Sequence, residues 1–187
     1  MLLDRSANIN AENQFGRTPL HDAIENKEIE IAELLLNHGA NVNASDKTGV
    51  TPLCLAVQQG HVNGVKMLMD RGANVNAETR DGTTPLHDAI EYDEIEIVEL
   101  LLNHGANVNA SDTSGISPLC LAVRKGHVNG VKMFLDRGAN VNAKTLDGTS
   151  PLHDAIENKE IEIAELLLNH GANVNACDKS GIILYCS

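Results

Sequence analysis

The sequence TPLHDAI at residues 18–24 decides the fold, because closely similar sequences follow it at a constant interval. The later copies lie at residues 51–57, 84–90, 117–123 and 150–156, each 33 residues after the one before. A fixed period of this length is typical of an array of equal supersecondary units, in which no single unit buries its apolar side alone. Neighbouring units bury that side by stacking, so stability is a sum over adjacent pairs. The repeat therefore predicts that function lies on a long surface rather than in a closed cleft.

Each unit is expected to contain two helices and a projecting turn. Thr18 is a helix-capping residue, and the apolar residues that follow it fall on one face at helical spacing. A second helix is expected to begin near Glu28 and to end at Gly39, which supplies a left-handed residue. We expect residues 41–44 to be short and extended, and residues 46–49 to form a turn before the next unit.

The composition excludes several functional classes. The chain has 14 Lys and Arg against 26 Asp and Glu, a net charge of −12 that repels phosphate backbones, so we expect no nucleic-acid partner. No run approaches the roughly 18 apolar residues that a membrane helix needs, and no signal-peptide pattern opens the chain, so we expect no membrane partner. The four cysteines lack CxxC spacing, which indicates reduced thiols in an intracellular compartment. We expect a cytoplasmic location, with the nucleus as the alternative.

The unit resembles that of the ankyrin-repeat family. The family pattern of Thr-Pro-Leu-His-x-Ala, a Leu-rich second helix, Gly-Ala-x-Val-Asn-Ala and Asp-x-x-Gly is matched at residues 18–23, 34–36, 39–44 and 46–49. The resemblance implies an all-α, ankyrin-type repeat solenoid of helix-turn-helix units with short projecting hairpin turns. Hairpin tips and first helices then line a concave face, and second helices form the convex back. It also implies protein–protein binding without shared catalytic residues.

On this pattern the chain is a single ankyrin-repeat domain, residues 1–187. Its parts are a partial repeat at 1–17, repeats at 18–50, 51–83, 84–116, 117–149 and 150–182, and a truncated end at 183–187. Solenoids need polar caps on their end units, and the sequence shows none at either end. We therefore expect mainly a monomer, with weak self-association through the apolar end faces.

The units alternate between two types, so the true period is 66 residues. Repeats 18–50, 84–116 and 150–182 carry Leu-His-Asp-Ala-Ile, whereas repeats 51–83 and 117–149 carry Leu-Cys-Leu-Ala-Val. This near-identity indicates recent tandem duplication or deliberate construction. Differences between like units gather at the turn tips and the ends of first helices, which face partners in the resembled family. Either a binding surface has diversified there, or exposed positions tolerate change.

The candidate partner-binding residues follow from these slots and from the preference of interface hot spots for aromatic residues and arginine. They are Phe15, Arg17, Arg80 and Leu146 near the tips, and Glu91, Tyr92, Arg124 and Lys125 near the ends of first helices. We expect Glu91 and Asp93 to approach Arg124 and Lys125 of the next unit. Such charges form either exposed pairs that contribute about 0–1 kcal/mol or a two-signed patch that orients a partner.

A residue of a metal-binding type, histidine or cysteine, stands at the same position of every unit: His21, Cys54, His87, Cys120 and His153. Stacked helices lie about 8–10 Å apart, whereas zinc ligands lie about 2 Å from the metal, so successive members cannot share an ion. We expect no metal, and the resemblance implies that the histidine bonds the turn of its own or a neighbouring unit. The sequence shows no serine–histidine–acid order, no phosphate-binding glycine loop and no paired carboxylates in an apolar pocket, so we expect neither an enzyme nor a cofactor.

The resemblance also implies a candidate modification. Asparagines of the family's Val-Asn-Ala segment are substrates of an asparaginyl hydroxylase that favours leucine eight residues earlier. Asn43, Asn76, Asn109 and Asn175 have that leucine, whereas Asn142 follows Phe134. In all five segments an asparagine replaces the acidic residue often found two positions before the target. The alternative is that these asparagines bond the hairpin backbone.

The sequence thus predicts a module that binds a protein or peptide on its concave face, as a preformed platform with little ordering cost. One alternative is a structural spacer within a larger ankyrin protein. Another is an engineered, consensus-like scaffold, which Gly64 inside a predicted helix argues against. Gly64 and Gly130 replace an isoleucine of the other units. Either something approaches the back closely there, or a neighbour packs tightly or the helix is merely weaker.

Overall fold

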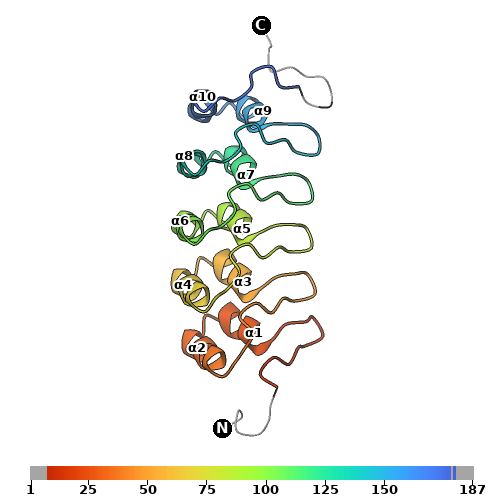
Figure 1. Cartoon of the computed structure of the whole chain (residues 1–187), viewed down its shortest axis with the longest axis vertical. Helices are drawn as coiled ribbons and strands as arrows, with labels where there is room; N and C mark the ends of the chain where they lie inside the picture. The colour runs from red at the N-terminus through yellow and green to blue at the C-terminus, as the bar shows by residue number, and fades with distance from the viewer. Residues whose placement is uncertain (1–7, 178, 180–187) are drawn as a thin grey trace.

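The chain forms a stack of five helix pairs, seen edge-on in Figure 1. The computed structural model describes residues 8–177 and 179, and within them ten helices alternate between two columns. The first helices are α1 (Pro19–Glu25), α3 (Pro52–Gln58), α5 (Pro85–Glu91), α7 (Pro118–Arg124) and α9 (Pro151–Glu157). The second helices are α2 (Ile29–Asn37), α4 (Val62–Asp70), α6 (Ile95–Asn103), α8 (Val128–Asp136) and α10 (Ile161–Asn169). Loops leave the first-helix column on the side away from the second helices (Figure 1).

Proline and left-handed residues set the helix bounds. Thr18 precedes α1 in an extended conformation, with φ −95° and ψ 166°, and Pro19 occupies the first turn, where its missing N–H is not needed. Between the two helices of a repeat the chain needs a positive φ, which Gly60 adopts at 63° and Lys27 at 58°. A residue with a Cβ pays about 1–2 kcal/mol for this conformation, so the repeats without glycine carry a local strain.

The core is aliphatic apart from Phe134 and is continuous from one repeat to the next. Each first helix packs against the second helix of its own repeat and against the first helix of the next, from α1 to α9. Leu20 and Ile24 of α1 and Leu86 and Ile90 of α5 are fully buried in these contacts. Phe134 is fully buried as well, at the position that Leu68 occupies in the earlier like repeat. The stack confirms the predicted periodic burial.

One local expectation changes in the structure, and one open alternative is decided. Residues 41–44 form a turn rather than an extended segment, because the Asn43 backbone N–H donates to Asn41 Oδ1 at 3.0 Å and the Ala44 N–H donates to the Asn41 carbonyl at 3.1 Å. The two helical glycines are buried against the chain itself. A Cβ on Gly64 would lie 3.0 Å from the His61 ring, and one on Gly130 would lie 3.2 Å from Ile90 Cδ1. Tight packing within the chain therefore explains both glycines.

Candidate functional site

The projecting loops are closed in two ways, which alternate with the repeat type. In repeat 18–50, Asp46 Oδ1 accepts from the backbone N–H groups of Thr48 and Val50, at 2.8 and 3.0 Å. In repeat 51–83 the hydroxyls of Thr79 and Thr83 hydrogen-bond to each other at 2.6 Å. The alternation of repeat types was visible in the sequence, but its effect on the hydrogen bonds that close the loops was not.

The recurring histidine holds its loop to the first helix. The Thr84 backbone N–H donates to His87 Nδ1 at 3.1 Å, and His87 Nε2 lies 3.0 Å from the Ile116 carbonyl. A carbonyl only accepts, so the Nε2 nitrogen carries the proton and the ring is neutral. Burial lowers the pKa of His87 and of the equivalent His21. In the other repeat type the Thr51 hydroxyl donates to Cys54 Sγ at 3.3 Å instead. The implied structural role of this position is confirmed.

Successive loops are joined by one backbone hydrogen bond each. The N–H groups of Lys47, Arg80, Thr113, Leu146 and Lys179 donate to carbonyls of the preceding loop at 2.9–3.0 Å. Glycine permits this approach: a Cβ on Gly82, whose φ is +74°, would lie 3.0 Å from the Thr113 nitrogen. The loops thus form one continuous row beside the first helices (Figure 1).

Three of the predicted partner-binding residues are large apolar side chains left in solvent. Phe15, in the first of these loops, and Leu146, in the loop that ends repeat 117–149, are 60% and 62% exposed, and Tyr92, directly after α5, is 52% exposed. Arg80 is also exposed and gives its backbone N–H to the Thr48 carbonyl.

The four other predicted residues are engaged in ion pairs within the chain. Arg17 Nη2 lies 2.8 Å from Glu25 Oε2, in the same repeat. Lys125 Nζ lies 2.9 Å from Glu91 Oε1 and donates to the Glu91 carbonyl, as expected for neighbouring units.

The expected approach of Arg124 to Glu91 and Asp93 is wrong. Arg124 points forward to the next repeat, where its Nε lies 2.9 Å from Asp154 Oδ2. Asp93 instead lies 3.5 Å from His127 Nε2. The arginine side chain at the end of α7 therefore lies over α9 rather than over α5.

A pocket that was not predicted from the sequence lies between α5, the loop at the end of the same repeat, and α7. Its volume is about 320 Å³, and it is lined by Thr83, His87, Asp88, Glu91, Asp112, Ile116 and Leu121. Asp88 is only 9% exposed, and burial raises its pKa to about 6. The Gln58 side-chain amide donates to its Oδ2 at 3.1 Å. Asp88 belongs to the repeated motif, so the only signal in the sequence was that Gln58 stands where the later repeat has Arg124.

The candidate hydroxylation residues Asn43, Asn76 and Asn109 tie each repeat to the next. Asn43 Nδ2 donates to the Gly72 carbonyl at 3.1 Å, and Asn43 Oδ1 accepts from the Asn74 backbone N–H at 2.7 Å. Asn76 and Asn109 make the equivalent bonds to their following repeats, and so does Asn142. At Asn175 the backbone N–H donates to Asn173 Oδ1. The structure thus gives these side chains a backbone-bonding role, and their hydroxylation stays a prediction.

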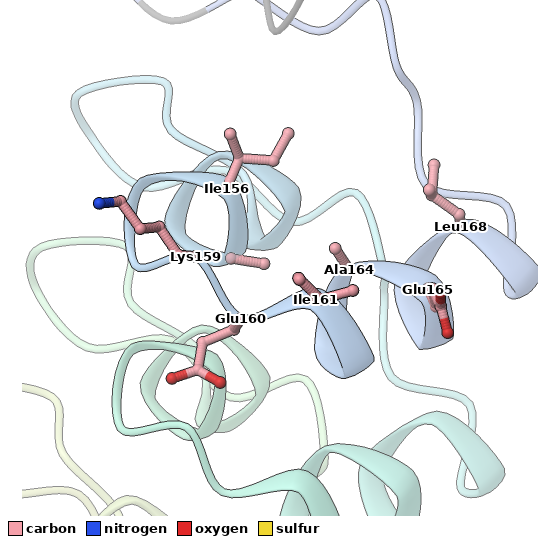
Figure 2. A pocket seen from close by; sticks show the side chains of 8 residues that line it. Ile156, Lys159, Glu160, Ile161, Ala164, Glu165 and Leu168 are labelled. Atoms are coloured by element: carbon pink, nitrogen blue, oxygen red, sulfur yellow. The ribbon is translucent and has the colours of Figure 1, made fainter.

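An apolar pocket of about 510 Å³ lies on the outer side of the last helix pair (Figure 2). Ile156, Ile161 and Leu168, which line it, are 48%, 75% and 44% exposed. The equivalent Ile90 and Leu102 are buried, because the following repeat covers them. The pocket is therefore the surface on which a repeat stacks, and not a preformed ligand cavity.

Within the part of the chain that the structure describes, no helix has the length and apolar character needed to cross a bilayer. Nor does any cluster of three or more His, Cys, Asp or Glu among those residues have the arrangement to hold a metal ion.

Comparison with known proteins agrees with this architecture. The family model described as ankyrin repeats (3 copies) matches residues 1–79, 45–112, 72–145 and 110–178. No curated protein sequence matches the chain. Among solved structures, the ankyrin repeat domain of Bcl-3, described as a unique member of the IκB protein family, is similar with a TM-score of 0.89 and 31% identity over 100% of this chain and 86% of that chain. The predicted all-α repeat solenoid is confirmed, and the chain belongs to the ankyrin-repeat family.

Proposed function

We propose that the chain binds a protein or peptide on the face formed by its loops and first helices, and that it is not an enzyme. The observation that carries this proposal is the exposure of Phe15, Tyr92 and Leu146 beside an otherwise aliphatic core. Each is more than half exposed, and aromatic side chains are the usual anchors of protein interfaces. Ankyrin repeats generally mediate protein–protein interaction, which supports the same reading.

The loop row supports a preformed platform. Backbone hydrogen bonds at 2.9–3.0 Å join every loop to the next, so little conformational freedom is left to lose when a partner binds. Arg17, Glu91, Arg124 and Lys125 are engaged in the chain, so we assign them a role in orienting the partner, and we assign anchoring to the apolar residues and Arg80.

Affinity capture with two matched variants tests the proposal. The first carries alanine at Phe15, Tyr92 and Leu146. The control carries alanine at Glu33, Glu99 and Glu165, which are exposed on the second helices. We expect proteins that bind the wild type and the control variant from lysate of the source cells but do not bind the first variant. If the three baits recover the same proteins, or none, the proposal is wrong and the chain is a structural spacer.

Two further expectations belong with this proposal. We expect a monomer that associates weakly through its end faces, in the cytoplasm or nucleus. Hydroxylation of Asn43, Asn76, Asn109 or Asn175 would appear as a mass increase of one oxygen on the corresponding peptides from eukaryotic cells.

A further inference from the structure

Asp88 is a buried carboxylate with no cationic partner among the residues that the structure describes. Its side chain lies in α5 and is 9% exposed, and among the described residues only the Gln58 amide hydrogen-bonds to it, at 3.1 Å. The pKa of about 6 leaves this carboxylate mostly ionised at neutral pH. A buried charge is stable only when it is paired or fully hydrogen-bonded, and one neutral amide meets a small part of that need.

The aspartate position of Asp88 recurs in the chain at Asp154, and there it has a cationic partner. Asp154 of α9 is equivalent to Asp88, and Glu157 is equivalent to Glu91. Arg124, thirty residues before Asp154 as Gln58 is thirty before Asp88, places its Nε 2.9 Å from Asp154 Oδ2. The chain thus shows that an aspartate at this position pairs with a guanidinium, which reaches Asp154 from the preceding first helix. From that side Asp88 meets only the neutral amide of Gln58 among the described residues.

The other polar groups of the pocket are already satisfied. Glu91 is paired with Lys125 at 2.9 Å, and Asp112 Oδ1 accepts two backbone N–H groups, at 2.8 Å each. Both ring nitrogens of His87 are used by Thr84 and the Ile116 carbonyl. The uncompensated charge of the pocket is therefore that of Asp88, and the pocket opens between first helices and a loop, on the face assigned to the partner.

We propose that this site, the Asp88 pocket, receives the guanidinium of an arginine side chain from the bound protein or peptide. The proposal rests on the proposed function and names the chemistry of its partner. Arginine fits better than lysine because its planar fork donates two parallel hydrogen bonds to one carboxylate. The pocket on the α7 side of Asp88 supplies the room, about 320 Å³, and the Arg124–Asp154 pair shows that an aspartate at this position binds a guanidinium.

The experiment uses the capped tripeptide acetyl-Gly-Arg-Gly-amide, and its citrulline counterpart as a neutral control of the same shape. Binding to the full chain is followed by NMR, through the side-chain amide of Gln58 and the backbone amides of residues 87–91, at low ionic strength. We expect saturable shifts with the arginine peptide, and affinity at least about tenfold weaker with the citrulline peptide or with Asp88→Asn.

Two reciprocal variants make the test specific to the pocket. Gln58→Arg should compensate the charge of Asp88 from the preceding helix, as Arg124 does for Asp154, and abolish the shifts at residues 87–91. Arg124→Gln should leave Asp154 without this partner and create new saturable shifts around Asp154. Shifts that persist in Gln58→Arg, that are equal for citrulline, or that are absent altogether would overturn the proposal. The capture experiment with Phe15, Tyr92 and Leu146 is independent of this titration, so failure of the pocket is distinguishable from failure of the binding function.

Discussion

Asn76 and Asn107 are joined by a hydrogen bond of 2.7 Å from the Asn107 backbone N–H to Asn76 Oδ1. The same side chain donates through Nδ2 to the Gly105 carbonyl at 3.1 Å, so one amide satisfies both partners at the end of the next repeat's second helix. The equivalent bonds recur at 2.7–2.8 Å from Asn10 to Asn142, which makes a ladder along the stack. Coupling between neighbouring repeats therefore has a polar component as well as an apolar one.

Asn76→Ala should destabilise the stack by about 1–3 kcal/mol, because it leaves a backbone donor and a backbone acceptor without their partner. The measurement is the free energy of unfolding in urea. Asn63→Ala is the matched control: Asn63 is exposed on α4, makes no side-chain hydrogen bond among the described residues, and should change stability by less than about 0.5 kcal/mol. Equal effects of the two substitutions would show that the ladder does not couple repeats.

Gly82→Ala should cost more than Gly72→Ala. Both glycines have a positive φ, +74° and +83°, so both substitutions pay the same conformational penalty of about 1–2 kcal/mol. Only at Gly82 does the new Cβ meet the next loop, 3.0 Å from the Thr113 nitrogen, whereas at Gly72 nothing lies within 4 Å. We expect a further loss of about 1–3 kcal/mol for Gly82→Ala in the same urea measurement. If the two substitutions lowered the free energy of unfolding equally, the loops would be able to move apart and accommodate the Cβ at no cost in stability.

The period of the sequence was sufficient to predict the helix pairs, their stacking and the projecting loops. Apolar spacing, Thr-Pro and glycine act locally, so they are readable from one unit. The Asp88 pocket was not predictable in this way, because its character depends on Gln58 in the neighbouring unit and on the direction of that side chain. Arg124 shows the same limit: its position was identified, but its ion pair lies forward with Asp154 rather than backward with Glu91.

Acid should destabilise the fold through the buried histidines. Burial lowers the pKa of His87, with Asp112 and Glu78 acting in the opposite direction, so the folded state binds its proton less readily than the unfolded state, whose pKa is about 6.5. The stability that the neutral His87 ring contributes is therefore present above about pH 6.5 and is lost as pH falls through that value. We expect His87→Cys, the residue of the other repeat type, to lose less stability than the wild type between pH 7.5 and 5.5 in urea titrations.

His104→Gln is the control for this pH dependence, since His104 is exposed and only caps α6 through the Leu100 carbonyl. It should follow the wild-type profile. A profile for His87→Cys that parallels the wild type would assign the acid sensitivity to other groups.

Association of the chain with itself should depend on the end face of Figure 2. Ile161 is 75% exposed there, within an apolar pocket of about 510 Å³, and contact between such surfaces removes them from water. Sedimentation velocity should show a monomer at low micromolar concentration and a reversible shift at several hundred micromolar. Ile161→Lys should remove that shift, whereas Lys66→Ala, on the exposed side of α4, should not. A wild type that stays monomeric throughout would exclude this contact.

Asp88→Asn should stabilise the fold at neutral and alkaline pH. Burial raises the Asp88 pKa from 3.8 to about 6, so the folded state binds the proton more tightly than the unfolded state and stability falls as pH rises from about 4 to 6. At about 1.4 kcal/mol per pKa unit, this corresponds to a gain of about 2–3 kcal/mol for the neutral amide at pH 8, and to little gain at pH 4.

Asp22→Asn, at the equivalent but 57% exposed side chain, is the control. It should change the free energy of unfolding little at either pH, as urea unfolding at the two values would show. Destabilisation by Asp88→Asn at pH 8 would mean that Gln58 compensates the charge fully. A gain in stability would instead mark Asp88 as a residue retained at a cost to the fold, as expected for a group whose counter-ion arrives with the partner.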